Sequence, residues 1–218
     1  IKIENKKVFT SRRFADFGCT VPTSLGFFVE IALEAGYDAY GFDPSSYAVE
    51  NAVKLNGHTR IRLGSIASVS YPPKAFDVIT LFDVFEHLGD PKKDLRKLYG
   101  FLKDDGIIVI ATGDTESFMA KQLGRRWTFY IPPQHLFFFN RTTLTKLLET
   151  EHLEPVRWFQ IGKWLSFRYV LHLARTTGES KLGAWLYDLA KVLHVERIPL
   201  YLPLRDNMVV IAQKKTHA

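Results

Sequence analysis

Along the first half of the chain, short apolar runs typical of strands alternate with stretches whose apolar residues have helical spacing. Short apolar runs, which predict buried strands, occur at 13–17, 37–43, 60–65, 76–85 and 106–113. The stretches between them show helical spacing, bounded by start and stop residues: Thr23 or Ser24 with Gly36, Ser45 or Ser46 with Gly57, and Asp90 followed by Pro91. This alternation predicts an α/β fold, a doubly wound parallel sheet with helices on both faces. In such sheets ligands bind at the carboxyl ends of the strands.

The second half of the chain departs from this regular alternation. Helices are predicted at 115–124 and, capped by Asn140, at 141–153, with an aromatic, proline-broken loop at 125–140 between them. Strands are predicted at 155–162 and 207–215, and two helical patterns fill 164–195. We therefore expect a single domain over residues 1–218, in which 164–195 forms a helical insert or cap before the final strand.

The amino-acid composition excludes several classes of protein. Hydrophobic residues make up 46 % of the 218 positions, enough for a packed core. The net charge of +6 comes from interleaved charges rather than a basic stripe, so no nucleic-acid partner is expected. Cys19 is the only cysteine, which excludes an internal disulfide and a zinc ribbon and favours the reducing cytoplasm. No metal site is predicted.

Signals for targeting or assembly are few. No apolar run approaches the roughly 20 residues of a membrane span, so none is expected. No signal peptide is visible, and a sequence that starts at Ile1 is compatible with a natural start further upstream. The sequence leaves the oligomeric state open.

Polar residues gather where the predicted strands end. Asp16-x-Gly18-Cys19 follows the first strand, Asp43 ends the second, and FDVITLFDVFEHLGDP (76–91) forms the fourth strand and its exit loop. The segment GRRWTFYIPPQHLFFFNRTTLTKLLE (124–149) follows later. Together these segments resemble the class I S-adenosylmethionine-dependent methyltransferase superfamily, in particular its small-molecule group with the motifs D-x-G-C-G-x-G and FDV-x-x-x-x-DV-x-EH.

The resemblance implies a Rossmann-like seven-stranded sheet whose last strand is antiparallel. It also implies an enzyme that transfers a methyl group from S-adenosylmethionine to a small-molecule acceptor, at oxygen or nitrogen, and releases S-adenosylhomocysteine. The cofactor-binding residues that it implies are Asp16, Gly18, Cys19, Gly26, Asp43, Pro44, Ser65, Ile66, Phe82 and Asp83.

Elementary chemistry supports these assignments. Glycines let the backbone approach a ligand closely, and Asp43 would accept hydrogen bonds from the two ribose hydroxyls. An acidic Asp16 suits a cationic sulfonium and amino group better than a pyrophosphate, which argues against a nicotinamide cofactor.

The glycine loop departs from the family motif. If GCTVP is aligned directly, Thr20 and Pro22 stand at glycine positions; otherwise Gly26 is the last motif glycine and the loop is a few residues longer. Ser65 stands where many relatives have an aspartate that binds the adenine amino group, and it offers only a neutral hydrogen bond. We interpret the loop as rebuilt, with cofactor binding retained. The alternative is a catalytically silent methyltransferase-like binding or scaffold protein.

Two histidines are the candidates for catalysis. His87 completes the EH of the motif and His135 lies in the aromatic loop, and a histidine can act as a base near neutral pH. In the alternative interpretation, His87 is a surface histidine in a loop, His135 is a histidine satisfied inside the aromatic loop, and Glu86 only holds the loop of His87 in shape. The candidate acceptor contacts are Arg126, Trp127 and Tyr130. We expect the loop 127–139 and the insert to cap the acceptor site.

Overall fold

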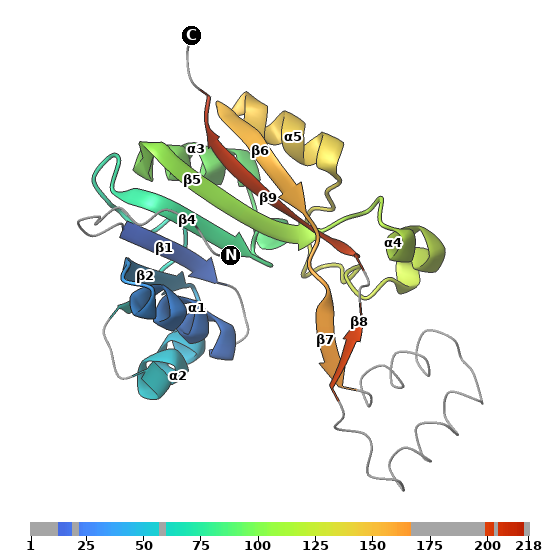
Figure 1. The fold of residues 1–218 in the computed structure, drawn as a ribbon, viewed down its shortest axis with the longest axis horizontal. Coiled ribbons are helices and arrows are strands. Elements are labelled where there is room, and N and C mark those ends of the chain that lie inside the picture. Colours follow the sequence, from blue (N-terminus) through green and yellow to red (C-terminus); the bar gives the residue numbers. More distant parts are fainter. Residues whose placement is uncertain (1–12, 19–21, 57–59, 167–198, 203–204, 216–218) are drawn as a thin grey trace, which may run out of the picture.

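The computed structural model describes residues 13–18, 22–56, 60–166, 199–202 and 205–215. Its strands are β1 (Arg13–Gly18), β2 (Asp38–Asp43), β3 (Ile61–Leu63), β4 (Phe76–Phe82), β5 (Leu102–Gly113), β6 (Leu153–Phe159), β7 (Lys163–Ser166), β8 (Pro199–Leu202) and β9 (Asn207–Lys214). Seven of them form one sheet in the order β3-β2-β1-β4-β5-β9-β6. Helices lie on both faces of this sheet, and the β7-β8 pair projects from it as an arm (Figure 1).

The closing strand β9 runs antiparallel to both of its neighbours, β5 and β6, whereas the other six strands are parallel. This confirms the expected seven-stranded sheet. β4 occupies the middle position, in agreement with its continuous apolar run. The strand order reverses between β1 and β4, so the carboxyl ends of these strands form the edge where a ligand is expected.

Capping residues fix the starts of several helices. The helices are α1 (Pro22–Glu34), α2 (Ser46–Asn56), α3 (Pro91–Phe101), α4 (Phe118–Leu123) and α5 (Arg141–Thr150). Asp90 and Ser45 accept hydrogen bonds from backbone N–H groups in the first turns of α3 and α2. Asn140 and Thr143 form a reciprocal capping box on α5. These caps satisfy N–H groups that would otherwise have no partner, which is why the three starts were predictable.

Helix α1 begins earlier than the sequence analysis predicted. The expected cap, Thr23 or Ser24, was wrong because the helix already includes Pro22. Proline suits the first helical position, since the N–H that it lacks would have no helical partner there. Only residues 19–21 separate β1 from α1. The structure therefore supports the direct alignment of GCTVP with the glycine motif and places Gly26 within the helix.

Apolar side chains pack against both faces of the sheet. On one face, Leu98 of α3 and Leu144 of α5 share the main core with Ile79 of β4. On the opposite face, Val29 of α1 and Ala52 of α2 belong to a second core. Successive strand residues point to opposite faces, so one strand serves both cores. This packing holds β1, β2 and β4 in register and positions their carboxyl ends.

The predicted helical insert begins with a strand, which corrects the expectation for its first residues. Lys163–Ser166 pairs antiparallel with Pro199–Leu202, and this pairing gives both segments the backbone partners that a helix would have supplied internally. The helical patterns expected over 167–195 lie outside the described residues. Among the helices that the structure describes, none has the length and apolar character needed to cross a membrane.

Candidate functional site

Asp16 lies near the carboxyl end of β1 with 3 % of its surface exposed. The Thr80 hydroxyl of β4 donates a 2.6 Å hydrogen bond to its Oδ1. Burial raises the pKa of Asp16 to about 7; the hydrogen bond from Thr80 opposes this shift, and the negative charge of Asp43 adds to it. A cationic ligand group at this edge would favour the ionised form of Asp16.

Asp43 ends β2 and is also buried. Its Oδ1 accepts a 2.8 Å hydrogen bond from the backbone N–H of Ser45, which is the ordinary turn role of an aspartate. Its main-chain oxygen accepts a 2.9 Å hydrogen bond from the N–H of Gly64, which ties β2 to the turn after β3. A carboxylate offers about four lone-pair positions, so an aspartate can accept more than one hydrogen bond.

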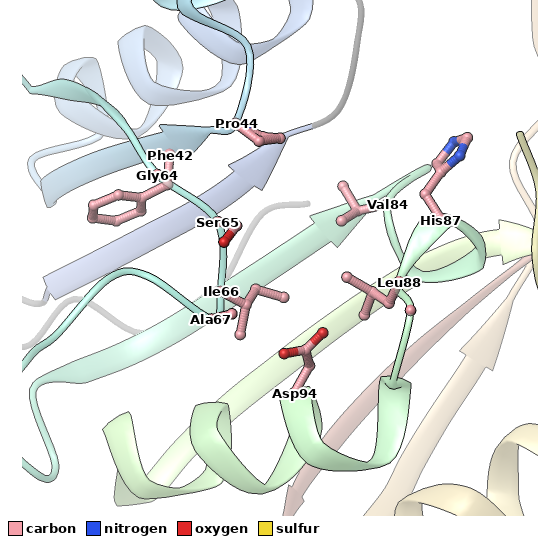
Figure 2. Close-up of a pocket in the computed structure, with 11 residues that line it drawn as sticks. Phe42, Pro44, Gly64, Ser65, Ile66, Ala67, Val84, His87, Leu88 and Asp94 are labelled. Atoms are coloured by element: carbon pink, nitrogen blue, oxygen red, sulfur yellow. The ribbon is translucent and has the colours of Figure 1, made fainter.

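A cavity of about 300 Å³ opens at the carboxyl ends of β2, β3 and β4. Pro44, Ser65 and Ile66, three of the predicted cofactor contacts, line it together with eight residues that were not predicted as cofactor contacts: Phe42, Gly64, Ala67, Val84, His87, Leu88, Gly89 and Asp94. Figure 2 shows Pro44 and Ser65 on one side of this space and Val84, His87 and Leu88 on the other. Mostly apolar walls with a few polar groups are typical of small-molecule sites.

His87 and His135 lie edge to face, with ring centroids 4.6 Å apart. His87 ends a 3-10 helix, η1 (Phe85–His87), and His135 belongs to the aromatic loop before α5. Their Nδ1 atoms lie 2.8 Å and 2.6 Å from the main-chain oxygens of Gln134 and Phe129, respectively. Because a carbonyl oxygen only accepts, each Nδ1 must carry the proton, and in the neutral rings each Nε2 keeps its lone pair. The structure thus brings together two histidines that the sequence suggested separately.

Glu86 connects the two segments that carry these histidines. Its main-chain oxygen accepts hydrogen bonds of 2.8 Å and 3.2 Å from the N–H groups of Leu136 and Phe137. Its buried side chain accepts a 2.7 Å hydrogen bond at Oε2 from the Thr112 hydroxyl of β5. Within the described part of the chain, Oε1 has no hydrogen-bond partner. Burial raises the pKa of Glu86 to about 7. The backbone of Glu86 therefore shapes the loop, as expected, while its carboxylate does more than the sequence indicated.

Ring packing orders the aromatic loop around His135. The Phe129 ring lies 4.3 Å from the His135 ring, centroid to centroid, and 5.2 Å from that of Trp127. A Cβ added at Gly113, the last residue of β5, would overlap the Phe129 ring. Burial lowers the pKa of His135, so its neutral form is favoured at neutral pH.

The candidate acceptor contacts occupy different environments. Trp127 is buried within the aromatic loop, so its ring is a packing element there. Tyr130 is partly exposed, and its ring packs in a tilted arrangement against that of Phe138, with ring centroids 5.0 Å apart. Arg126 is exposed in a short 3-10 helix, η2 (Gly124–Arg126). Of these three, Tyr130 and Arg126 remain accessible to an acceptor.

The remaining predicted cofactor residues lie around the ends of β1 and β4. Gly18 pairs with Phe82 across these strands, and the Phe82 ring packs on Phe28 of α1. Asp83 is exposed and has a positive φ of 53°, which marks the sharp exit from β4. Cys19 lies outside the described residues.

A family model described as a methyltransferase domain matches residues 6–157, well over half of the chain. The chain belongs to this methyltransferase family. Among curated proteins, this methyltransferase is similar to the mitochondrial ubiquinone biosynthesis O-methyltransferase of Schizosaccharomyces pombe, with 30 % identity over 114 residues. That match covers 49 % of this chain and 40 % of the relative. The chain spans less than half the length of the curated relatives it matches.

Solved structures show the same fold. A SAM-dependent methyltransferase from Archaeoglobus fulgidus superposes with a TM-score of 0.59 at 20 % identity, covering 94 % of this chain and 86 % of that one. The YcgJ protein of Bacillus subtilis gives a TM-score of 0.58 at 16 % identity and covers 95 % and 93 % of the two chains. At such identities the similarity concerns the fold alone.

S-adenosylmethionine is the cofactor that membership in this family implies, and the residues of the site fit it. The cavity has apolar walls suited to a flat ring, and two of its lining residues, Phe42 and Pro44, are the sequence neighbours of the buried acceptor Asp43. Asp16 adds a second buried carboxylate at the same edge of the sheet, suited to a cationic group.

Proposed function

We propose that this methyltransferase transfers a methyl group from S-adenosylmethionine to an oxygen or nitrogen atom of a small-molecule acceptor. The observation that carries the proposal is the continuity of the site. One cavity is lined both by Phe42 and Pro44, the sequence neighbours of Asp43, and by His87, whose ring contacts that of His135. The proposed cofactor subsite therefore lies next to the two histidines, His87 and His135.

Each part of the cavity has a separate task in this proposal. Asp43 accepts hydrogen bonds from ribose hydroxyls, while Pro44, Ser65 and Ile66 enclose the adenine. Asp16 and Gly18 hold the cationic methionine end. When bound, S-adenosylmethionine supplies an electrophilic methyl group; the chain's contribution is to hold donor and acceptor in near-attack geometry, worth up to roughly 7–11 kcal/mol.

His87 and His135 activate the acceptor in this proposal. With Nδ1 fixed as the donor to a main-chain oxygen, each neutral ring presents Nε2 as a lone-pair donor. Such a nitrogen can take a proton from a hydroxyl or an amine as the methyl group arrives. The aromatic loop 127–139 and the insert cap the acceptor, with Arg126 and Tyr130 as accessible polar contacts.

Calorimetric titration with S-adenosylmethionine and S-adenosylhomocysteine tests the cofactor part of the proposal. We expect saturable binding of both at about one molecule per chain. A panel of phenols, amines and carboxylic acids, assayed for S-adenosylhomocysteine release, then tests the acceptor class. Absence of cofactor binding would refute the proposal and support the catalytically silent alternative.

A further inference from the structure

Glu86, His87 and His135 form a compact group of metal-binding side chains. One ligand atom from each residue, a carboxylate oxygen or an imidazole nitrogen, lies within 4.8 Å of the other two. Two of the residues belong to η1 and the third to the aromatic loop, so the fold brings the group together from separate segments. Of the part of the chain that the structure describes, this is the group that has metal-ligating geometry.

The surroundings of the group resemble those of a metal centre. In metal sites a ligating histidine usually donates its other ring N–H to a carbonyl or carboxylate, which fixes the tautomer and the ring orientation. Both histidines do this here, through Nδ1 to the main-chain oxygens of Gln134 and Phe129. The Thr112 hydroxyl in turn orients the Glu86 carboxylate through Oε2. Each of the three side chains therefore has a hydrogen bond that fixes its orientation.

The Glu86 carboxylate supplies a second, independent observation. Its side chain is fully buried, and Oε1 has no hydrogen-bond partner among the described residues. A buried carboxylate oxygen without a partner is costly, and a bound cation would satisfy it.

We propose that Glu86, His87 and His135 bind a divalent first-row transition-metal ion such as Zn²⁺ or Co²⁺. Two imidazoles and one carboxylate are the ligand set that such ions accept, whereas Mg²⁺ and Ca²⁺ prefer oxygen ligands. Three protein ligands leave at least one coordination position open, and His87 also lines the cavity.

The ion changes how the two histidines act in the proposed reaction. Their Nε2 lone pairs would hold the ion and would no longer accept a proton. The ion would instead act as a Lewis acid that lowers the pKa of a coordinated acceptor hydroxyl, so that the hydroxyl loses its proton to solvent, and its oxygen would then take the methyl group as S-adenosylhomocysteine leaves. This step rests on the proposed methyl transfer and selects hydroxyl acceptors over amines that are protonated at neutral pH. Binding of the metal itself does not depend on that function.

Metal titration of the full chain after removal of metals with a chelator tests the site directly. We expect about one Zn²⁺ per chain by calorimetry, and visible Co²⁺ absorption bands whose intensity indicates fewer than six ligands. Glu86→Gln and His135→Ala should each weaken Zn²⁺ binding at least tenfold, and Thr112→Val should weaken it by a smaller factor through loss of orientation.

His152→Asn is the matched control, since it removes an exposed histidine outside the group and asparagine tolerates its positive φ of 59°. His87→Ala, at a half-buried position, tests the site if a variant of a buried ligand does not fold. Unchanged Zn²⁺ affinity in folded Glu86→Gln and His87→Ala, or an equal loss in His152→Asn, would overturn the proposal.

Separate readouts distinguish this inference from the proposed function. Chelation should abolish methyl transfer while leaving the affinity for S-adenosylmethionine unchanged. If the chain binds the cofactor and transfers methyl groups after chelation, the role of the ion in the reaction is refuted and the proposed function stands, while the Zn²⁺ titration decides the metal site itself. If it binds Zn²⁺ as predicted but no cofactor, the proposed function fails and the metal site stands.

Discussion

At the scale of single residues, Asp16 has a consequence for stability that can be measured. Its pKa is ordinary in the unfolded chain and about 7 in the folded chain, where it faces Thr80 and Asp43. The folded protein therefore retains a proton that the unfolded protein has lost, so this stabilising contribution is greatest at acidic pH and decreases as the pH rises through about 7. We predict that the free energy of unfolding of the wild type falls relative to Asp16→Asn by roughly 2–3 kcal/mol between about pH 5 and about pH 8.

Chemical denaturation of both proteins across this pH range measures the difference. Asparagine keeps an oxygen that can accept the Thr80 hydrogen bond, and the buried Glu86 is present in both proteins, so its titration cancels. Parallel stability curves would show that Asp16 is ionised in the folded protein.

Asp43 allows a sharper test of the cofactor site than simple truncation. Asp43→Ala would also remove the turn hydrogen bond from Ser45, whereas Asp43→Asn retains an acceptor for it. We expect Asp43→Asn to weaken S-adenosylmethionine binding by roughly 1.5–3 kcal/mol, because ribose hydroxyls lose a charged acceptor. Calorimetric titration measures this loss.

The control for this prediction is Asp38→Asn, at the opposite end of the same strand. Asp38 pairs with Arg13 and Arg60 on the surface, far along β2 from the cavity. The Asp38→Asn variant should bind S-adenosylmethionine with the same affinity as the wild type. Equal affinity for wild type and Asp43→Asn would remove Asp43 from the cofactor site.

The location of a candidate site residue was predictable where it depended only on the position of that residue along a strand. Asp16 and Asp43 lie near or at the ends of their strands, Pro44 and Ser65 lie just after strand ends, and parallel strands bring those ends to one edge. The carboxylate of Glu86 was not predictable in this way. Its partner Thr112 comes from a different strand, and only the folded chain places both beside the histidines.

At the scale of elements, the contact between β5 and the aromatic loop controls the position of His135. Gly113 has no room for a Cβ because the Phe129 ring occupies that space, and the main-chain oxygen of Phe129 fixes Nδ1 of His135. We predict that Gly113→Ala lowers the free energy of unfolding by about 1–3 kcal/mol through overpacking. It should also weaken Zn²⁺ binding by displacing the loop.

Gly100→Ala is the matched control within helix α3, where an added Cβ meets nothing within 4 Å. It should leave Zn²⁺ binding unchanged and raise the free energy of unfolding by up to about 1 kcal/mol, because alanine favours the helix. Denaturation and metal titration of both variants provide the comparison. A Gly113→Ala protein as stable as the wild type would contradict the tight packing of Phe129.

Element boundaries were predictable where a side chain caps its own helix. Asp90 and Asn140 lie one residue before the helices that they cap, so the signal is local. The start of α1 was missed because Thr23 and Ser24 mimic a cap while Pro22 is equally suited to the first helical position. β7 was missed because its partner, β8, is remote in sequence.

At the scale of the whole molecule, the β7-β8 arm is separable from the sheet. Phe159 of β6 pairs with Val209 of β9 within the sheet, while Lys163 and Leu202 pair at the base of the arm. Next to the arm, the Gln160 side chain donates a hydrogen bond to the main-chain oxygen of Arg205, and the Ile161 N–H donates one to Asn207 Oδ1, so these two flanking segments lie side by side. We predict that a short Gly/Ser linker in place of 163–202 leaves the fold and S-adenosylmethionine affinity intact, because closing a short loop costs little.

Circular dichroism and cofactor titration of this deletion variant check the prediction, with wild type as reference. Methyl transfer should decrease, since the insert is proposed to cap the acceptor. A deletion variant that fails to fold would show that the insert is part of the structural core.

The α/β architecture was predictable because strand and helix periods alternate along the sequence. That alternation does not indicate which strands β9 lies between. Its apolar residues identify a strand without specifying its neighbours. The antiparallel direction of β9 came from the family resemblance, and its position between β5 and β6 became visible only in the folded structure.

That position has a consequence for synthesis in the cell. β9 follows the other six strands of the sheet in the sequence, yet it separates β5 from β6, so β6 has no partner in the sheet until residues 207–214 have been synthesised. Pairing over such long sequence separations is slow, and during the delay the edges of β5 and β6 stay open to other chains. Chains terminated before residue 207 should therefore aggregate and engage chaperones, whereas a chain that includes β9 can pair β6 within its own sheet.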